Sequence, residues 1–376
     1  MKFNAYGHEN LLATHRNTFE FTNENFLTKR GDCIIGIDAK INFKDDVAKL
    51  KKTLDYNNSE TIRKIKILIT QGKHEELVTA FFNPDFDHHE AMVIRKSTFL
   101  DKRTFGYKAN KSAKELKRDL FRELKTNDRD KKLSVQIKPV KIKNIIFDFD
   151  DTLEEWTQSQ IKTNEVLAAK IKRDYGIKKS DFKREFRNAI EKFILHTKDP
   201  KKYGRDVWLN ETFSKLGVKV PKSYIDELLD LYWTEIQKHI KLEKHVIPML
   251  QKLKQKYNLY ILSDSDGNRE IKMVRIHQLN LESYFNDIIT SDDTMSNKPT
   301  KQAFQFLLDK HKLNAEECFA VGDHAQTDLY TPKKLGMSTV WVKQGHWGKA
   351  SDVDLNYVDF QITDLIDLVK IVEKFE

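Results

Sequence analysis

Two aspartates spaced one residue apart are the strongest candidates for chemistry in this sequence of 376 residues. Asp148 and Asp150 follow the apolar residues 145–147, which are β-branched or aromatic and predict a buried central strand. Asp148 is therefore expected at the carboxyl end of that strand, where open α/β sheets place their ligand crevice. Two acids on the same side of an extended chain are costly unless a cation or a substrate group shares them. The alternative is a loop of solvated or N-capping aspartates, and the rest of the chain argues against it.

Polar residues also follow the later predicted strands or precede a helix of this region, which gives the set Ser263, Asp264, Lys298, Asp323 and Asp328. A hydroxyl and backbone amides after a strand suit a phosphate oxygen, as helix N-termini do. A lysine that precedes a proline in the first turn of a helix can reach back into the crevice. An acid pair, a hydroxyl, a lysine and further acids at strand ends are hard to obtain by accident.

The elements that must position these residues begin near residue 142, where strand and helix patterns start to alternate as in a parallel sheet. After the first strand, the predicted strands are 259–262, 287–290, 319–321 and 339–342. The predicted helices of this part are 245–256, 267–279, 299–312, 332–335 and a last one from 363 onward. Residues 154 to about 243 interrupt the alternation with helical patterns alone, at 160–175, 180–195, 208–216 and 221–240. We therefore expect a core at 142–153 and 246–376, with a helical cap at 154–245 over the strand ends.

Residues 142–375 resemble the haloacid-dehalogenase (HAD) superfamily hydrolases that carry a helical cap in the first insertion position. The DxDxT motif of that family is matched by Asp148, Asp150 and Thr152, and its second-strand hydroxyl by Ser263. Its lysine is matched by Lys298, and its GDxxxxD motif by Gly322, Asp323 and Asp328. All four motifs occur in order over about 230 residues. The resemblance implies an α/β fold, a Rossmannoid parallel sheet with an inserted α-helical cap.

The resemblance further implies a Mg²⁺-dependent phosphatase that works through an aspartyl-phosphate. Asp148 would be the nucleophile, and Asp150 would protonate the leaving oxygen and then deprotonate the hydrolytic water. The metal site would use the Asp148 carboxylate, the Asp150 backbone carbonyl and Asp323, with Asp328 beside it to orient waters or Lys298. The phosphoryl group would be held by Thr152, Ser263, the amide of Asp264 and Lys298. Because a halide leaving group needs no proton, the presence of Asp150 favours phosphoryl transfer over dehalogenation.

The substrate is expected to touch the cap. Residues 198–205 are predicted to form an exposed basic loop that either folds over the crevice and binds substrate through Arg205, or is a solvated surface. The implied substrate is a small phosphorylated metabolite such as phosphoglycolate or a triose phosphate, and a phosphomutase of the same superfamily is the alternative. The other cap residues that are candidates for substrate contact are Trp156, Arg184, Arg187, Lys201, Lys202, Tyr203 and Trp208.

The N-terminal third predicts a separate, mostly β domain of the mixed α+β class at residues 1–138. Its predicted strands are 11–21, 33–37, 65–69, 77–82, 92–94 and 104–107, followed by a helix at 112–125. Residues 3–125 resemble an archaeal domain family of unknown function, through the segments at 7–10, 13–18, 30–36 and 94–97. These segments contain the polar residues His8, His15, Arg16, Asp32, Arg95 and Lys96. They either form an anion-binding site together or have local structural roles.

Charge and composition limit the remaining function classes. Of the net charge of +9, the first 140 residues supply +8, with 28 Lys and Arg against 20 Asp and Glu. That bias allows a nucleic-acid partner for residues 1–138, but an ordinary charged surface is favoured because no stripe of basic and aromatic residues stands out. The distant Cys33 and Cys318 and the absence of a long apolar run predict a reduced, cytoplasmic protein without a membrane span.

Overall fold

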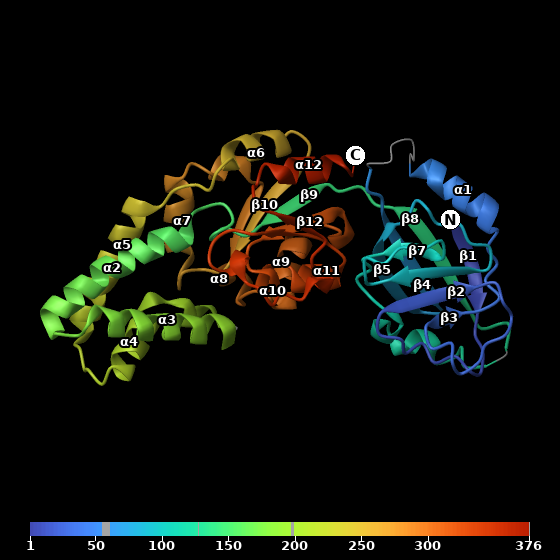
Figure 1. Cartoon of the computed structure of the whole chain (residues 1–376), viewed down its shortest axis with the longest axis horizontal. Coiled ribbons are helices and arrows are strands. Elements are labelled where there is room, and N and C mark those ends of the chain that lie inside the picture. Colours follow the sequence, from blue (N-terminus) through green and yellow to red (C-terminus); the bar gives the residue numbers. More distant parts are fainter. Residues whose placement is uncertain (55–60, 127, 197–198, 376) are drawn as a thin grey trace.

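The computed structural model describes residues 1–54, 61–126, 128–196 and 199–375, which form two sheets and a helical lobe (Figure 1). Within these residues the C-terminal sheet has six strands, all parallel, in the order β11-β10-β9-β12-β13-β14. This arrangement confirms the predicted parallel α/β core. The strands are β9 (Asn144–Phe147), β10 (Asn258–Ser263), β11 (Asp287–Thr290), β12 (Cys318–Gly322), β13 (Ser338–Val342) and β14 (Phe360–Ile362).

Helices cover both faces of this sheet, so its central strands are buried on both sides. Ile145 and Phe147 of β9 join one apolar cluster with α6 and α12, whereas Ile146 joins a second cluster with α9 on the other face. An uninterrupted apolar run is what a doubly covered strand requires, which explains the pattern of residues 145–147. The helices of this domain are α6 (Val246–Leu253), α7 (Arg269–Gln278), α8 (Ser291–Thr294), α9 (Lys301–His311), α10 (Ala325–Asp328), α11 (Tyr330–Leu335) and α12 (Asp367–Glu373).

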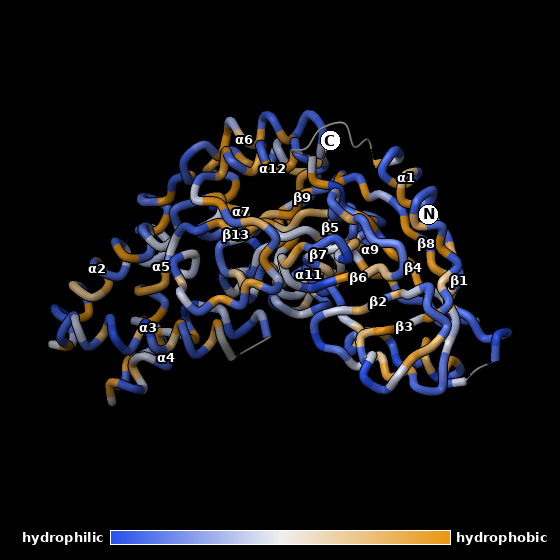
Figure 2. The backbone as a smooth tube through the Cα atoms, turned by 45° about the vertical axis from the view of Figure 1, so that its right-hand side comes forward, coloured by the Kyte–Doolittle hydropathy of each residue, from blue (hydrophilic) through white to orange (hydrophobic). Residues whose placement is uncertain are grey.

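The chain between β9 and β10 forms the helical cap that the sequence predicted, with no strand among its described residues. Its helices are α2 (Trp156–Tyr175), α3 (Lys179–His196), α4 (Arg205–Lys215) and α5 (Lys222–His239). Hydrophobic and hydrophilic stretches alternate along them, as amphipathic helices require (Figure 2). They share an apolar core of their own, which includes Leu167, Phe186, Leu209 and Leu228.

The N-terminal domain is a mixed sheet of eight strands within the described residues, in the order β1-β8-β4-β5-β7-β6-β2-β3. Most neighbours pair antiparallel, whereas β2 with β3 and β6 with β7 pair parallel. Across the described part of the chain, no helix is both long and apolar enough to cross a bilayer. The elements are β1 (Lys2–Tyr6), β2 (Thr18–Thr22), β3 (Ile34–Gly36), α1 (Phe43–Thr53), β4 (Lys64–Gln71), β5 (His74–Phe82), β6 (Ala91–Arg95), β7 (Thr104–Tyr107) and β8 (Lys132–Pro139).

Two predictions in this domain were wrong. The strand predicted at 11–21 is confined to β2, because residues 11–17 form a loop that bonds to Asp32 O through Thr14 N and His15 N. The helix predicted at 112–125 is instead two short 3₁₀ turns, Ala113–Glu115 and Arg118–Phe121. Arg118 explains this break, since its guanidinium bonds to the carbonyls of Leu116, Ala113 and Ala13 and holds the chain in a non-helical path.

The two sheets meet at the amino ends of β12 and β13, at the opposite end of the strands from the predicted crevice. Lys64 of β4 donates to Glu316 O at 2.9 Å and to Gly336 O at 2.8 Å, just before those two strands begin. Phe81 of β5 packs against Phe360 and Phe375 of the core. The N-terminal domain is thus joined to the core by buried polar and apolar contacts and does not cover the crevice.

The buried Lys64 predicts a specific pH dependence of stability. Burial lowers the pKa of its ammonium from 10.5 to about 7, so the folded protein releases a proton there that the unfolded chain still binds. Since the unfolded state binds more protons between these two values, Lys64 makes stability rise with pH there, by up to about 1.4 kcal/mol per pH unit. Above pH 9 the two thiols act in the opposite direction, because burial raises the pKa of Cys33 and of Cys318 from 9.0 to about 12. Urea unfolding between neutral pH and pH 9.0 should therefore show the rise in the wild type and lose it in Lys64→Met.

The neighbouring Lys66 supplies the control for this measurement. It pairs with Glu316 at 2.7 Å across the same contact but is partly exposed. Lys66→Met should therefore keep the pH dependence of the wild type. If the curves of wild type and Lys64→Met stay parallel over this range, Lys64 remains charged in the folded protein and the prediction is wrong.

Candidate active site

Adjacent strands of the parallel sheet bring the predicted acids to one edge. β9 lies between β10 and β12, and these three strands end at Phe147, Ser263 and Gly322. Asp148 and Asp323 are the next residues after β9 and β12, and Asp148 N donates to Val321 O at 2.9 Å. The carboxyl edge of the sheet therefore places the acids side by side, as open α/β folds do for ligand sites.

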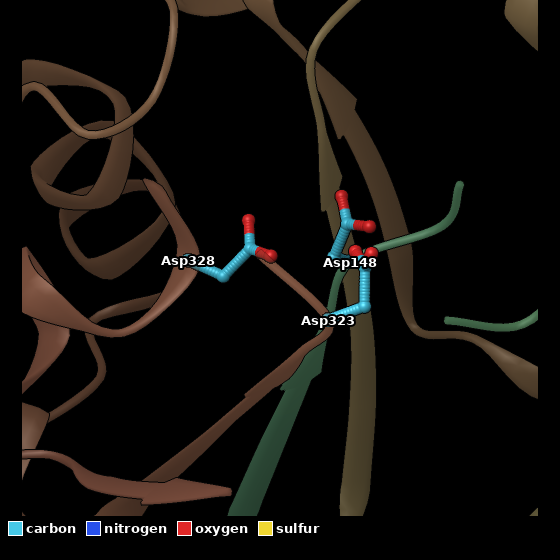
Figure 3. A group of neighbouring side chains, drawn as sticks. All are labelled: Asp148, Asp323 and Asp328. Carbon is cyan, nitrogen blue, oxygen red and sulfur yellow. The ribbon is translucent and has the colours of Figure 1, made fainter. Parts of the chain in front are cut away.

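Asp148, Asp323 and Asp328 form a buried acid cluster, shown in Figure 3 with its carboxylates turned toward one another. One carboxylate oxygen from each lies within 4.8 Å of the others. Burial, with repulsion from neighbouring acids, raises the pKa of Asp323 well above its usual range, and burial raises that of Asp148 to about 7. Among the described residues, Asp323 Oδ2 is buried and has no hydrogen-bond partner. Closely spaced carboxylate oxygens, one of them without a partner, fit a hard divalent cation.

Lys298 supplies the positive charge beside this cluster. Its Nζ lies 2.6 Å from Asp148 Oδ1 and 2.6 Å from Asp328 Oδ1. Burial alone would lower the pKa of Lys298, but Asp148, Asp328 and Asp264 raise it well above its usual range. Lys298 is thus held in its charged form next to Asp148. It reaches back to the strand end, as predicted from its place before α9.

Asp150 points away from the acid cluster, toward two cations of α7 that were not among the residues predicted for the site. Lys272 and Arg275 both pair with its carboxylate. Burial alone would raise the pKa of Asp150, but these cations outweigh it and hold the pKa below its usual range. The sequence held one sign of this pairing, because Lys272 and Arg275 are three residues apart and therefore lie on one face of a helix.

A cavity of about 600 Å³ opens above these residues, between the core and the cap. Asp148, Asp150, Lys298, Asp323 and Asp328 line its core side. Its cap side is lined by residues of α2, α3 and α4, among them Trp156, Gln160, Asn164, Arg187 and Trp208. The cavity therefore brings the acids and the lysine to a space that the cap encloses.

Comparison with known proteins identifies the core and the cap. The family model of the haloacid dehalogenase-like hydrolases matches residues 145–342. The chain belongs to this hydrolase family. The glyceraldehyde 3-phosphate phosphatase of Methanocaldococcus jannaschii is 29% identical over 237 residues, covering 62% of this chain and 99% of that protein. The crystal structure of the HAD hydrolase YfnB of Bacillus subtilis bound to magnesium matches 62% of this chain and 99% of that one. Its TM-score is 0.50 at 19% sequence identity, so this likeness supports the fold alone.

The N-terminal domain has relatives of its own. A family model named as a domain of unknown function, DUF371, matches residues 3–139. The uncharacterized protein MJ0206 of Methanocaldococcus jannaschii is 39% identical over 127 residues, which cover 32% of this chain and 87% of that protein. The resemblance inferred from the N-terminal motifs is confirmed, and this hydrolase therefore combines two domain families.

Two of the residues predicted to hold phosphate have other contacts in this hydrolase. Thr152 is fully buried, where its Oγ1 donates to Asp148 Oδ2 at 3.3 Å and accepts from Asp323 N at 3.1 Å. These bonds hold the two strand ends together, and the phosphate contact expected of Thr152 stays a prediction. Ser263 Oγ donates to Asp264 O at 3.3 Å and does not line the cavity, whereas Asp264 does. Asp264 Oδ1 accepts from Lys298 N at 2.9 Å, which helps to position that lysine.

The cap segment expected to be an exposed loop is folded into the cap. Residue 198 lies outside the described residues, but residues 200–203 form a 3₁₀ turn, and Tyr203 and Arg205 are buried. Arg184 pairs with Asp181 and Glu185 on the surface. Of the predicted cap contacts, Trp156, Arg187, Tyr203, Arg205 and Trp208 line the cavity, whereas Arg184, Lys201 and Lys202 do not.

Four of the six polar residues for which an N-terminal anion site was one interpretation have local partners. His15 Nδ1 accepts from Thr18 N at 3.1 Å, and His8 Nδ1 accepts from Asn10 N at 3.0 Å. Arg95 pairs with Asp101, and Lys96 pairs with Glu115. These bonds favour the structural interpretation and leave the nucleic-acid alternative without support.

Proposed function

We propose that this hydrolase is a Mg²⁺-dependent phosphatase of small phosphate monoesters. The observation that carries the proposal is the contact of Asp148 with Lys298 inside an acid cluster that opens into the cavity. A carboxylate at this position can attack phosphorus once its negative charge is offset. The names of relatives, among them the glyceraldehyde 3-phosphate phosphatases, support a phosphate ester as substrate.

The metal would be held by Asp148, Asp323 and the backbone carbonyl of Asp150, with Asp328 close by. This donor set consists of oxygens, which Mg²⁺ prefers. When bound, Mg²⁺ supplies positive charge that offsets the repulsion between these acids and a phosphate. Lys298 adds a second positive charge at Asp148 and would contact the phosphoryl oxygens in the reaction.

The proposed reaction has two steps at two carboxylates. Asp148 attacks phosphorus and forms an aspartyl-phosphate, while Asp150 gives a proton to the departing alcohol oxygen. In the second step Asp150 takes a proton from water, whose oxygen attacks phosphorus and releases Asp148 and inorganic phosphate. For the first step one oxygen of Asp150 must release its cation and take up a proton from water, which it then gives to the leaving oxygen, while its other oxygen stays paired and keeps the carboxylate in place.

The substrate we propose is a triose phosphate or a small acid phosphate such as phosphoglycolate. The test is the release of inorganic phosphate from glyceraldehyde 3-phosphate, dihydroxyacetone phosphate and phosphoglycolate, with Mg²⁺ and then with EDTA. We expect release in Mg²⁺, loss in EDTA and recovery when Mg²⁺ is restored in excess, because the acid cluster needs a cation to accept an anionic ester.

Product analysis separates this function from its alternative. A phosphomutase would return the phosphoryl group and give an isomeric ester in place of free phosphate. The proposal fails if no ester of the panel releases phosphate, or if release is equally fast in EDTA.

A further inference from the structure

A close contact between glycines joins the cap to the core directly beside the cavity. Gly204 precedes α4 of the cap, and Gly267 lies in the core loop between β10 and α7. Gly267 has a φ of +100°, and a Cβ placed on it would lie 2.6 Å from Gly204 Cα. Any side chain at position 267 would thus push the cap away from the core.

The residue next to each glycine forms an ion pair across the same joint. Arg205 Nη2 donates to Asp266 Oδ1 at 3.0 Å, and both side chains are 4% exposed or less. Burying two charges is expensive, so the pair is stable only where other groups hold each partner in place. Both partners have such groups.

Rings from three cap helices hold the guanidinium of Arg205. Its Cζ lies between 4.1 and 5.5 Å from the centroids of four rings, and Nη1 donates to Tyr203 O at 2.9 Å. Cation–π contacts of this kind fix both the position and the plane of a guanidinium. Arg205 must therefore move with the cap. The rings belong to Trp156, Trp208, Tyr232 and Trp233.

On the core side, Asp266 contacts the two cations that hold Asp150. Its Oδ2 accepts from Arg275 Nη1 at 2.6 Å and lies 3.3 Å from Lys272 Nζ. Lys272 and Arg275 pair in turn with the carboxylate of Asp150. A continuous set of ion pairs thus runs from the cap, through the buried Asp266, to the partly exposed Asp150.

We propose that Asp266 is a positioning residue that sets the orientation of Asp150 according to whether the cap is docked. With the cap docked, Arg205 takes one oxygen of Asp266, and the other oxygen fixes Lys272 and Arg275 around Asp150. When the cap leaves, Asp266 loses Arg205 and the two cations lose a fixed partner. The proposal rests on the proposed function, in which Asp150 protonates the leaving group.

The test is leaving-group dependence in Asp266→Asn. Alkyl esters such as glyceraldehyde 3-phosphate need a proton on the leaving oxygen, whereas p-nitrophenyl phosphate does not. Because kcat/KM covers the steps up to leaving-group departure, we expect it to fall about tenfold to a hundredfold for the alkyl ester. For p-nitrophenyl phosphate it should stay within about threefold of the wild type. An equal loss for both esters would mean a merely structural role and would overturn the proposal.

A second variant tests the role of cap docking without any change of charge. Gly267→Ala should separate the joint and give the same selective loss as Asp266→Asn. Gly176→Ala is the control, because Gly176 also has a positive φ, +69°, but no heavy atom of the described residues lies within 4 Å of a Cβ there. Both variants place alanine at a positive φ, and only Gly267→Ala adds the contact with Gly204, so a selective loss only in Gly267→Ala points to the joint. If Gly267→Ala behaves like Gly176→Ala, docking does not set Asp150.

Small-angle X-ray scattering separates a failure of this proposal from a failure of the proposed function. Asp266→Asn and Gly267→Ala should increase the radius of gyration relative to wild type and Gly176→Ala, with or without activity. If the wild type releases no phosphate but these increases occur, the function is wrong and the joint stands. If the radius of gyration is unchanged in both variants, the joint does not hold the cap and the proposal fails.

Discussion

Asp148→Asn is expected to reduce phosphate release by at least about a thousandfold, because an amide cannot serve as the nucleophile. The substitution changes no volume, and it removes one charge from a buried cluster in which Asp323 and Asp328 already repel it. The variant should therefore fold, and circular dichroism should match that of the wild type. Phosphate release from a triose phosphate in Mg²⁺ measures the loss.

An acid on the surface gives the control for this substitution. Asp226 lies exposed on α5 of the cap, away from the cavity lining, so Asp226→Asn should keep the wild-type rate. Acid-quenched wild type analysed by mass spectrometry during turnover should carry one phosphoryl group that Asp148→Asn lacks. A variant that keeps more than a tenth of the activity would place the nucleophile elsewhere.

The sequence was most informative where local pattern and burial coincide. Residues 145–147 are apolar because β9 is covered on both faces, and the four cap helices are amphipathic because each contributes one face to a shared core. Their predicted ranges therefore agree closely with the structure, as 160–175 does with Trp156–Tyr175. β8 was missed for the opposite reason, because the residues before it are polar and its own alternation includes exposed lysines.

Side chains that act over long sequence separations could not be predicted in this way. Lys272 and Arg275 pair with Asp150 across more than 120 residues, and no local pattern marks such a partnership. Arg205 was expected on an exposed basic loop, because its neighbours Lys201 and Lys202 are charged. Its burial depends on aromatic rings from three helices, which only the folded cap brings together.

The position of the N-terminal domain bears on why two domain families share one chain. It contacts the core at the amino ends of β12 and β13, through Lys64 and Phe81, whereas the acid cluster lies at the carboxyl ends. Among the described residues, the cavity is lined by the cap and the core and by none of the N-terminal domain. The N-terminal domain therefore contacts the core at the end opposite to this site.

Lys298→Met is expected to lower both catalysis and stability. The substitution leaves Asp148 and Asp328 buried without the cation that lies 2.6 Å from each. Breaking a buried pair in this way costs about 3–5 kcal/mol of unfolding free energy. Activity should fall about a thousandfold, since the same ammonium offsets the charge that develops on the phosphoryl group. Urea unfolding and phosphate release on the same preparation give the two numbers.

Lys333→Met separates the two effects, because the same domain contains a second buried lysine–aspartate pair far from the cavity. Lys333 Nζ lies 2.6 Å from Asp359 Oδ1 and also donates to Lys108 O, at the contact with the N-terminal domain. This variant should lose a similar amount of stability while its folded molecules keep the wild-type kcat. Equal losses of kcat in both variants would mean that instability alone explains the effect at Lys298. A loss confined to Lys298→Met would assign the charge of Lys298 to the reaction itself.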